Sequence, residues 1–119
     1  MKTIGIILLL ALFISCDKPV SKNDAEANSQ SSACINDVIT KIQNEAVRNP
    51  PAKVYSYQYN GQLVYFIPQY CCDIPSVLLD ADCKTICAPD GGISGGGDGK
   101  CKDFFSKRTD EKLIWADSR

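Results

Sequence analysis

The apolar side chains of the first folded stretch recur at helical spacing. They lie at offsets of one, four, five, eight and twelve from the first of them, on one stripe of a helix: Cys34, Ile35, Val38, Ile39, Ile42 and Ala46. Ser31 or Ser32 can cap the N-terminus. Asn49-Pro50-Pro51 ends the helix, because proline cannot continue the hydrogen-bond ladder. The pattern predicts an N-terminal amphipathic helix.

A change from helical to alternating spacing predicts a β-hairpin over residues 53–68. The first strand contains Tyr55, Tyr57 and Tyr59, Asn60-Gly61 has the sequence of a type I′ turn, and residues 62–67 return as the second strand. A two-residue loop fixes the register. The expected cross-strand pairs are Val54 with Ile67, Tyr55 with Phe66, Ser56 with Tyr65, and Tyr57 with Val64.

Both faces of this hairpin are partly apolar, so one face can pack under the helix. The tyrosine face must then meet a second layer or remain exposed as an aromatic surface. Tyrosine is common at interfaces because its ring is apolar and its tip polar, so Tyr55, Tyr57 and Tyr59 are candidate contact residues. The alternative is that they are ordinary strand residues lying half buried.

Shorter apolar runs complete the expected fold. Val77 to Leu79 and Lys84 to Cys87 are expected strands, Asp103 to Phe105 a helical turn, and Lys112 to Trp115 a last strand that returns the only tryptophan to the core. The fold class is α+β: an N-terminal amphipathic helix packed on a small antiparallel sheet of about four strands, linked by disulfides.

The N-terminus predicts export and anchoring. One lysine precedes an apolar run from Ile4 to Ile14, which is too short to span a bilayer of ~30 Å and indicates a signal peptide. Ser15-Cys16 then resembles a bacterial lipobox, in which the cysteine is lipidated; the alternative is an ordinary secretory signal with an incidental cysteine. Lipidation would anchor the chain stably to a membrane.

The expected organisation is therefore a lipoprotein signal peptide over residues 1–16, a flexible polar tether over 17–32 and one small disulfide-rich domain over 33–119. The expected location is the bacterial cell envelope, facing the periplasm or the cell surface. Asp17 directly after the lipidated cysteine suggests inner-membrane retention only in some bacteria, so the choice of membrane stays open.

Composition narrows the function. With 13 basic and 14 acidic residues there is no clustered positive charge for nucleic acid. Histidine is absent, which removes the commonest general base and metal ligand. No cofactor is expected.

The cysteines predict disulfides rather than a metal site. If Cys16 is lipidated, six remain, and outside the cytoplasm they predict three bridges: Cys34, Cys71, Cys72, Cys83, Cys87 and Cys101. Adjacent cysteines seldom bridge each other, so we expect Cys71 and Cys72 to point to opposite faces and to bind different partners. Twelve pairing schemes stay open, and a bridge from Cys87 to Cys101 occurs in two of them. The Cys-x-x-Cys spacing of zinc sites is missing.

The glycine-rich stretch from Asp90 to Lys100 superficially resembles an ion-binding loop. Its glycine spacing fails the P-loop template. Four aspartates, Asp80, Asp82, Asp90 and Asp98, could converge on calcium, but the EF-hand spacing is missing. Glycines at positive φ are the simpler account. Asp90, Asp98 and Lys100 remain candidate contact residues.

Several motifs together resemble a known family. They are Cys71-Cys72-Asp73, the run from Ile86 to Gly92, the segment from Gly97 to Cys101, and Leu113-Ile114-Trp115. They are similar to a family of small lipoprotein domains of unknown function from Bacteroidota-type bacteria, over about Cys34 to the C-terminus. The resemblance implies an extracytoplasmic location and no assigned activity.

The expected function is a noncatalytic binding or accessory lipoprotein. Its partners would be the membrane, through the lipid anchor, and an envelope or extracellular protein or a glycan. The alternative is an inhibitor of an extracellular or periplasmic enzyme, because a small rigid loop presents a preorganised contact. A third candidate is a hydrolase that pairs Asp73 with Asp80 or Asp98.

Overall fold

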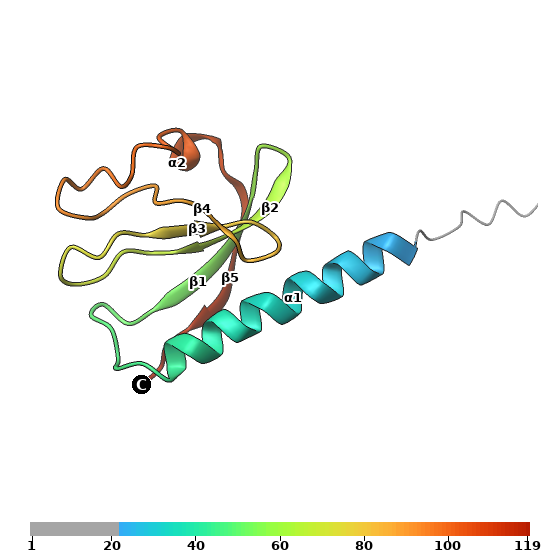
Figure 1. Cartoon of the computed structure of the whole chain (residues 1–119), viewed down its shortest axis with the longest axis horizontal. Coiled ribbons are helices and arrows are strands. Elements are labelled where there is room, and N and C mark those ends of the chain that lie inside the picture. Colours follow the sequence, from blue (N-terminus) through green and yellow to red (C-terminus); the bar gives the residue numbers. More distant parts are fainter. Residues whose placement is uncertain (1–21) are drawn as a thin grey trace, which may run out of the picture.

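A computed structural model describes the chain from residue 22 to 119, with side chains from residue 33 onward. The elements run in the order shown in Figure 1: α1 Lys22–Gln43, β1 Lys53–Tyr59, β2 Gln62–Ile67, β3 Val77–Leu79, β4 Thr85–Cys87, α2 Phe104–Lys107 and β5 Thr109–Ala116. The predicted signal peptide, Cys16 and residues 17–21 lie outside the described residues. Because α1 begins at Lys22, it starts earlier than its apolar stripe indicates; the division into tether and domain stays a prediction.

The strands form one antiparallel sheet of five strands in the order β4-β3-β2-β1-β5. The expectation of about four strands was therefore too low. The last strand is longer than predicted, since β5 begins at Thr109 and pairs with β1 along most of its length. Its first half is charged and exposed at the edge of the sheet, so no apolar alternation marked it as a strand.

The β1–β2 hairpin has the predicted register. Asn60 and Gly61 both have positive φ, 50° and 74°, as a type I′ turn requires. Three predicted cross-strand pairs are confirmed: Tyr55 with Phe66, Ser56 with Tyr65, and Tyr57 with Val64. This register assigns alternate side chains of β1 to opposite faces of the sheet.

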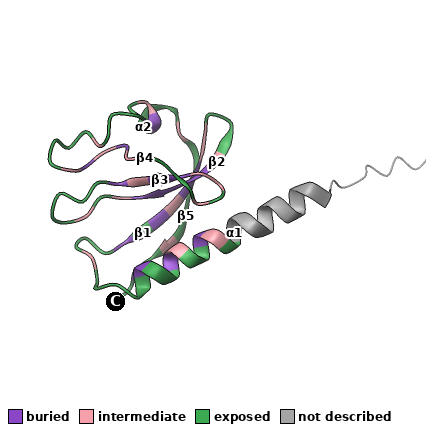
Figure 2. Ribbon diagram, in the orientation of Figure 1, coloured by how far each residue is buried: buried purple, intermediate pink, exposed green. Residues whose placement is uncertain are grey.

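The first face of the sheet packs against the second half of α1 (Figure 2). The buried residues of this aliphatic core are Ile35, Ile39, Ile42, Ala52, Val54, Tyr65, Ile67 and Leu79. Trp115 is half buried and packs against the same core, as its predicted return to the core requires. The Cys34–Cys83 disulfide links α1 to the turn between β3 and β4. We call this side the α1 face.

The second face of the sheet is covered by α2 and by the irregular chain before it. Its buried residues are Tyr57, Val64, Phe66, Leu78, Cys87, Cys101 and Phe104. Phe104 is completely buried, and its ring centroid lies 5.6 Å from that of Tyr57 and 5.3 Å from that of Phe66. The tyrosine side of the hairpin therefore meets a second layer. We call this side the aromatic face.

The last residue of the chain binds the end of α1. The Arg119 guanidinium donates hydrogen bonds to the carbonyl oxygens of Gln43 (2.7 Å), the last residue of α1, and of Glu45 (3.2 Å), just beyond the helix. It also pairs at 2.7 Å with Asp117, whose carboxylate is buried. A cation beside the carbonyls at a helix C-terminus is favourable, so this contact joins the end of the sheet to α1.

Three connections meet at one end of the sheet: residues 44–52, 68–76 and 88–103 (Figure 1). We call this the loop end. The Lys22 end of α1 projects from the other side of the domain. Within the described residues, no helix is long and apolar enough to cross a membrane.

Candidate functional site

The glycine-rich stretch forms a compact loop that bonds to itself. The Gly91 amide donates to the Gly95 carbonyl, the Gly95 amide to Gly92, and the Gly97 amide back to Gly91, at 3.0 to 3.1 Å. The Asp98 amide donates to the Ala88 carbonyl at 2.9 Å, and the Cys87–Cys101 disulfide closes the ends. This pairing is one of those the sequence left open. The loop is therefore held in one shape by its backbone and by a covalent link.

Two glycines of the loop cannot be replaced without moving the backbone. At Gly97, where φ is 64°, a Cβ atom would lie 1.9 Å from the Ala88 carbonyl oxygen. At Gly91, where φ is 82°, it would lie 2.6 Å from the Gln69 side chain and 3.0 Å from the Pro75 backbone. The account of these glycines as positive-φ residues is confirmed, and close approach to the neighbouring loops adds to it.

The tip of this loop presents an apolar side chain to solvent. Ile93 is 95% exposed and borders a shallow hollow of about 500 Å³ shared with Asp73 and Pro75 of the β2–β3 connection. Each of the other two connections at the loop end also carries a large exposed aliphatic residue, Val47 and Ile74. Each of the three loops therefore exposes an aliphatic side chain, which sequence patterns did not indicate.

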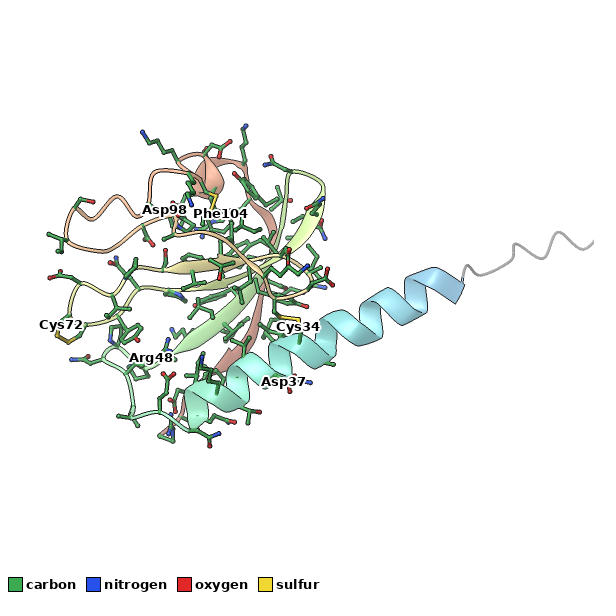
Figure 3. The ribbon with its side chains drawn as sticks, in the orientation of Figure 1. Cys34, Asp37, Arg48, Cys72, Asp98 and Phe104 are labelled. Atoms are coloured by element: carbon green, nitrogen blue, oxygen red, sulfur yellow. A yellow bond between two sulfur atoms is a disulfide. The ribbon has the colours of Figure 1, made fainter. Side chains whose placement is uncertain are left out.

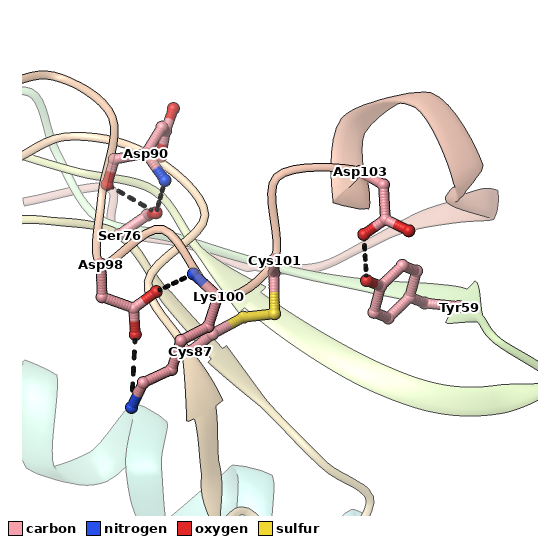
Figure 4. Close-up of a disulfide and its surroundings, with 8 residues drawn as sticks. All are labelled: Tyr59, Ser76, Cys87, Asp90, Asp98, Lys100, Cys101 and Asp103. Carbon is pink, nitrogen blue, oxygen red and sulfur yellow. Dashed lines mark hydrogen bonds and ion pairs between the residues drawn. A yellow bond between two sulfur atoms is a disulfide. The ribbon is translucent and has the colours of Figure 1, made fainter.

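The three charged candidates in the loop act mainly within it (Figure 4). The Asp90 backbone exchanges hydrogen bonds with Ser76, while its Oδ1 atom is buried and has no hydrogen-bond partner among the described residues. Asp98 accepts the Lys100 backbone N–H at 3.0 Å, which is the main cause that lowers the pKa of its carboxyl group. Its ion pair with the Lys100 ammonium is long, at 4.0 Å. These contacts order the loop and leave the Lys100 side chain largely exposed.

The three tyrosine candidates differ in exposure. Tyr57 is 3% exposed, and its hydroxyl donates to Glu111 at 2.5 Å and accepts from Arg108 at 3.3 Å. Burial, followed by the hydrogen bond to Glu111, raises the pKa of Tyr57 to about 12. Tyr57 is thus a residue of the aromatic core rather than of an exposed surface.

The other two tyrosines are half buried. The Tyr59 hydroxyl donates to Asp103 at 2.6 Å (Figure 4), and this hydrogen bond is the main cause that raises the pKa of Tyr59. Tyr55 lies beside Tyr57, with 6.2 Å between their ring centroids, and borders a hollow at the loop end. Of the three, Tyr55 is therefore the one placed for an external contact.

The carboxylates proposed for hydrolysis are only partly brought together. Asp80 lies in the β3–β4 turn, where its Oδ1 atom accepts the backbone N–H groups of Asp82 and Lys84, both at 2.9 Å. Asp73 and Asp98 border the same open hollow. Because a hydrolytic pair needs one carboxyl group whose pKa is raised, the lowered pKa of Asp98 suits an anion and not a proton donor.

The structure corrects the expectation for Cys71 and Cys72, which form a disulfide with each other. Neighbouring side chains point apart in an extended strand, which is the conformation expected for these residues. Residues 71–73 instead form a turn between Tyr70 and Ile74, the Cys71–Cys72 peptide is cis, and Asp73 has a φ of 65°. All six cysteines are still paired in three bridges, as predicted.

Sequence reasoning missed Arg48 and Tyr70. The guanidinium of Arg48 lies 4.2 Å from the centroid of the Tyr70 ring, and its Nη2 atom pairs with Glu45 at 2.9 Å. Both residues border two hollows of about 200 and 250 Å³, at the same end of the sheet as Cys72 (Figure 3). Neither residue belongs to a recognisable motif, and only the meeting of two loops brings them together.

Among residues 33–119, no three histidine, cysteine, aspartate or glutamate side chains are grouped to hold a metal ion. The four aspartates considered for calcium are divided between the β3–β4 turn and the glycine loop. These aspartates therefore do not form one ligand group within residues 33–119.

The fold and these surfaces define a small disulfide-linked α+β domain with an apolar loop end. Residues 40–117 match the model of DUF6970, a domain of unknown function, and the chain belongs to this family. The match confirms the resemblance to a family of domains of unknown function. Comparison with curated proteins and with solved structures finds no match.

Proposed function

We propose that the protein is a lipid-anchored, noncatalytic binding domain of the bacterial cell envelope, from a Bacteroidota-type bacterium, and that it binds its partner through the loop end. The main support for this proposal is the exposure of Ile93, an aliphatic residue at the tip of a loop that is closed by a disulfide and by its own hydrogen bonds. A loop whose backbone is already held in its bound shape loses little entropy on binding, which favours affinity.

The neighbouring loops support the same surface. Val47 and Ile74, on the other two loops of the loop end, are also exposed, and several exposed apolar residues at one end of a molecule mark an interaction site more often than a single one does. Aliphatic side chains favour an apolar pocket of a protein over the polar surface of a glycan. The Lys22 end of α1 projects away from the loop end (Figure 1). A chain anchored at Cys16 would therefore present its loops away from the membrane.

Anchoring is tested by metabolic labelling with palmitate in the native bacterium. We expect the full-length chain to incorporate the label and to sediment with membranes, and the Cys16→Ala variant to do neither. Labelling that survives Cys16→Ala would contradict lipidation at this residue.

Binding is tested by placing a photo-crosslinking amino acid at position 93 of the full-length chain in the same cells. The control is the same substitution at position 113, because Leu113 is also well exposed but lies on the edge strand β5. We expect one discrete cross-linked product from position 93 that position 113 does not give. Identical products from both positions, or none from position 93, would contradict the proposal.

The glycine loop also supports a second candidate, an inhibitor of an extracellular or periplasmic enzyme. Its backbone forms turns over residues 91–99 rather than an extended segment, so it would obstruct an active site instead of imitating a peptide substrate. The chain lacking residues 1–16 should then reduce the activity of one enzyme in a panel of proteases and lysozymes, and Ile93→Ser should abolish the effect. Full activity across the panel would count against inhibition.

A further inference from the structure

An apolar groove lies between α1 and the connection from β2 to β3. Its volume is about 250 Å³, and we call it the α1 groove. Ile42, Ile67 and Leu79 of the aliphatic core form its floor, and Val38 of α1 faces Ile74 and Pro75 across it. The groove therefore gives a ligand access to apolar side chains that belong to the core.

The rim of the α1 groove carries two cations and one anion. Lys41 and Arg48 border it together with Glu45, which pairs with Arg48 at 2.9 Å, and no other acidic side chain lines it. Its net charge is thus positive. A positive rim above an apolar floor is complementary to an apolar chain that ends in an anion.

Not every hydrogen-bond donor of the Arg48 side chain has an acceptor among the described residues. Its side chain is 14% exposed, and its Nε–H group is buried with no hydrogen-bond acceptor among the described residues. A buried N–H group without an acceptor is unfavourable, so the free energy falls if the guanidinium turns toward a new acceptor. Carboxylates accept two parallel hydrogen bonds from arginine, which makes a carboxylate the natural acceptor.

We propose that the α1 groove binds a medium-chain fatty acid, with the acyl chain on Ile42, Ile67 and Leu79 and the carboxylate at Arg48 and Lys41. The volume suits one slender chain, since pockets for drug-sized ligands start at about 300 Å³. A sugar would find few polar partners on the apolar floor. Ile93 does not line the α1 groove, but Ile74 of the loop end does, and Pro75 borders both hollows. Failure of the two proposals is still distinguishable, because the cross-link at position 93 tests the loop end and decanoate binding tests the groove.

The first experiment measures binding of sodium decanoate, below its micelle concentration, to residues 16–119 carrying Cys16→Ser. This chain contains every described residue and has no acyl group of its own to compete. We expect saturable binding by calorimetry, with NMR shifts at Val38, Ile74 and Val77 and none at Leu113. Affinity should rise about four-fold per added methylene from octanoate to decanoate, until the groove is full.

The second experiment tests the head group and the groove separately. Decanol should bind about ten-fold more weakly than decanoate, and Arg48→Met should reduce this difference, with Lys41 left to hold the carboxylate. Lys53→Met is the matched control, because Lys53 borders the neighbouring hollow and not the groove. Ile74→Trp should abolish binding by filling the groove; Ile74 is partly exposed, so the variant should keep the wild-type circular dichroism spectrum.

Several results would overturn the proposal. They are equal affinity for decanoate and decanol, tighter binding of a decyl ammonium compound, unchanged binding in a folded Ile74→Trp variant, or shifts centred on Leu113. Binding that is absent at every chain length would overturn it as well.

Discussion

The two faces of the sheet are closed in different ways. The α1 face is covered by a regular helix, its buried side chains are mostly aliphatic, and its disulfide spans 49 positions of sequence. The aromatic face is covered by an irregular segment and one helical turn, its rings cluster around Phe104, and its disulfide spans 14 positions. A helix satisfies its own backbone, whereas an irregular cover needs individual contacts to hold it.

Those individual contacts are visible on the aromatic face. Tyr57 binds Glu111 of β5, Tyr59 binds Asp103 just before α2, and Arg108 lies 4.7 Å from the centroid of the Tyr57 ring. The Tyr59 and Arg108 contacts join the hairpin to the covering segment, and the Tyr57 hydrogen bond joins it to the edge strand β5. The cover of the aromatic face is therefore held by the contacts of a few residues, and single substitutions there should have large effects on stability.

The largest effect is expected from Phe104→Ala, which empties the centre of the aromatic core. Removing a fully buried phenylalanine costs about 3 to 5 kcal/mol of unfolding free energy. Phe105→Ala is the matched control, because Phe105 is 41% exposed and should cost much less. Urea denaturation of both variants measures the difference. Equal losses would show that the aromatic face is not organised around Phe104.

The stability that each disulfide contributes should increase with the length of the loop that it closes. In the chain-entropy model, replacing Cys34 and Cys83 by serine costs about 4 kcal/mol, and replacing Cys87 and Cys101 about 3 kcal/mol. Replacing Cys71 and Cys72 should cost far less, because neighbouring residues enclose no loop. Denaturation of the three double variants checks the order, after mass spectrometry has shown that each keeps two bridges. A large loss for the Cys71 and Cys72 variant would contradict it.

Alkaline pH should act selectively on the aromatic face. The pKa of Tyr57 is raised to about 12 in the folded chain, against about 10 when unfolded, so the unfolded chain loses this proton first. The contribution of Tyr57 to the free energy of unfolding is fully present below pH 10, and about 2 to 3 kcal/mol of it is lost as the pH rises to 12. Denaturation at pH 9 and pH 12 measures the loss, and Tyr57→Phe should reduce it. If Tyr57→Phe loses as much stability between pH 9 and pH 12 as the wild type, groups other than Tyr57 cause the loss.

The smallest effect is expected at the Arg119 contact, which lies at the chain end on the α1 face. The pKa of Asp117 is lowered, chiefly by the hydrogen bond from the Arg119 side chain. Its stabilising contribution is therefore present above an ordinary aspartate pKa of about 4 and is lost as the pH falls. Arg119→Ala should lower the melting temperature at pH 7 and flatten its decline toward pH 3. Arg119→Lys is the control that keeps the charge, and identical pH profiles would refute the assignment.

Much of the fold follows from local pattern. The alternation of Tyr55, Tyr57 and Tyr59 and the Asn60-Gly61 turn fix a hairpin whose register the structure confirms, and Val77–Leu79 is a strand with the predicted bounds. These signals are local because side-chain periodicity reports which face is buried. The first half of β5 gave no such signal, since an exposed edge strand has no buried face to produce alternation.

The candidate site was less predictable. The glycine loop was found, because glycine at positive φ leaves a compositional trace, and its Cys87–Cys101 closure was among the open pairings. The Cys71–Cys72 bridge was missed because its turn has no sequence signature. The Arg48 and Tyr70 contact joins two loops far apart in sequence, and no one-dimensional pattern reports such a meeting.

The position of Trp115 gives the two faces separate optical reporters. The only tryptophan packs against the aliphatic core on the α1 face, whereas Tyr57 and Tyr59 ionise on the aromatic face. Tryptophan emission therefore follows the α1 face, and the part of the tyrosinate absorbance that Tyr57→Phe removes follows the aromatic face, since Tyr65 lies in the aliphatic core. If the two signals change together during unfolding, the sheet couples its two cores into one cooperative unit.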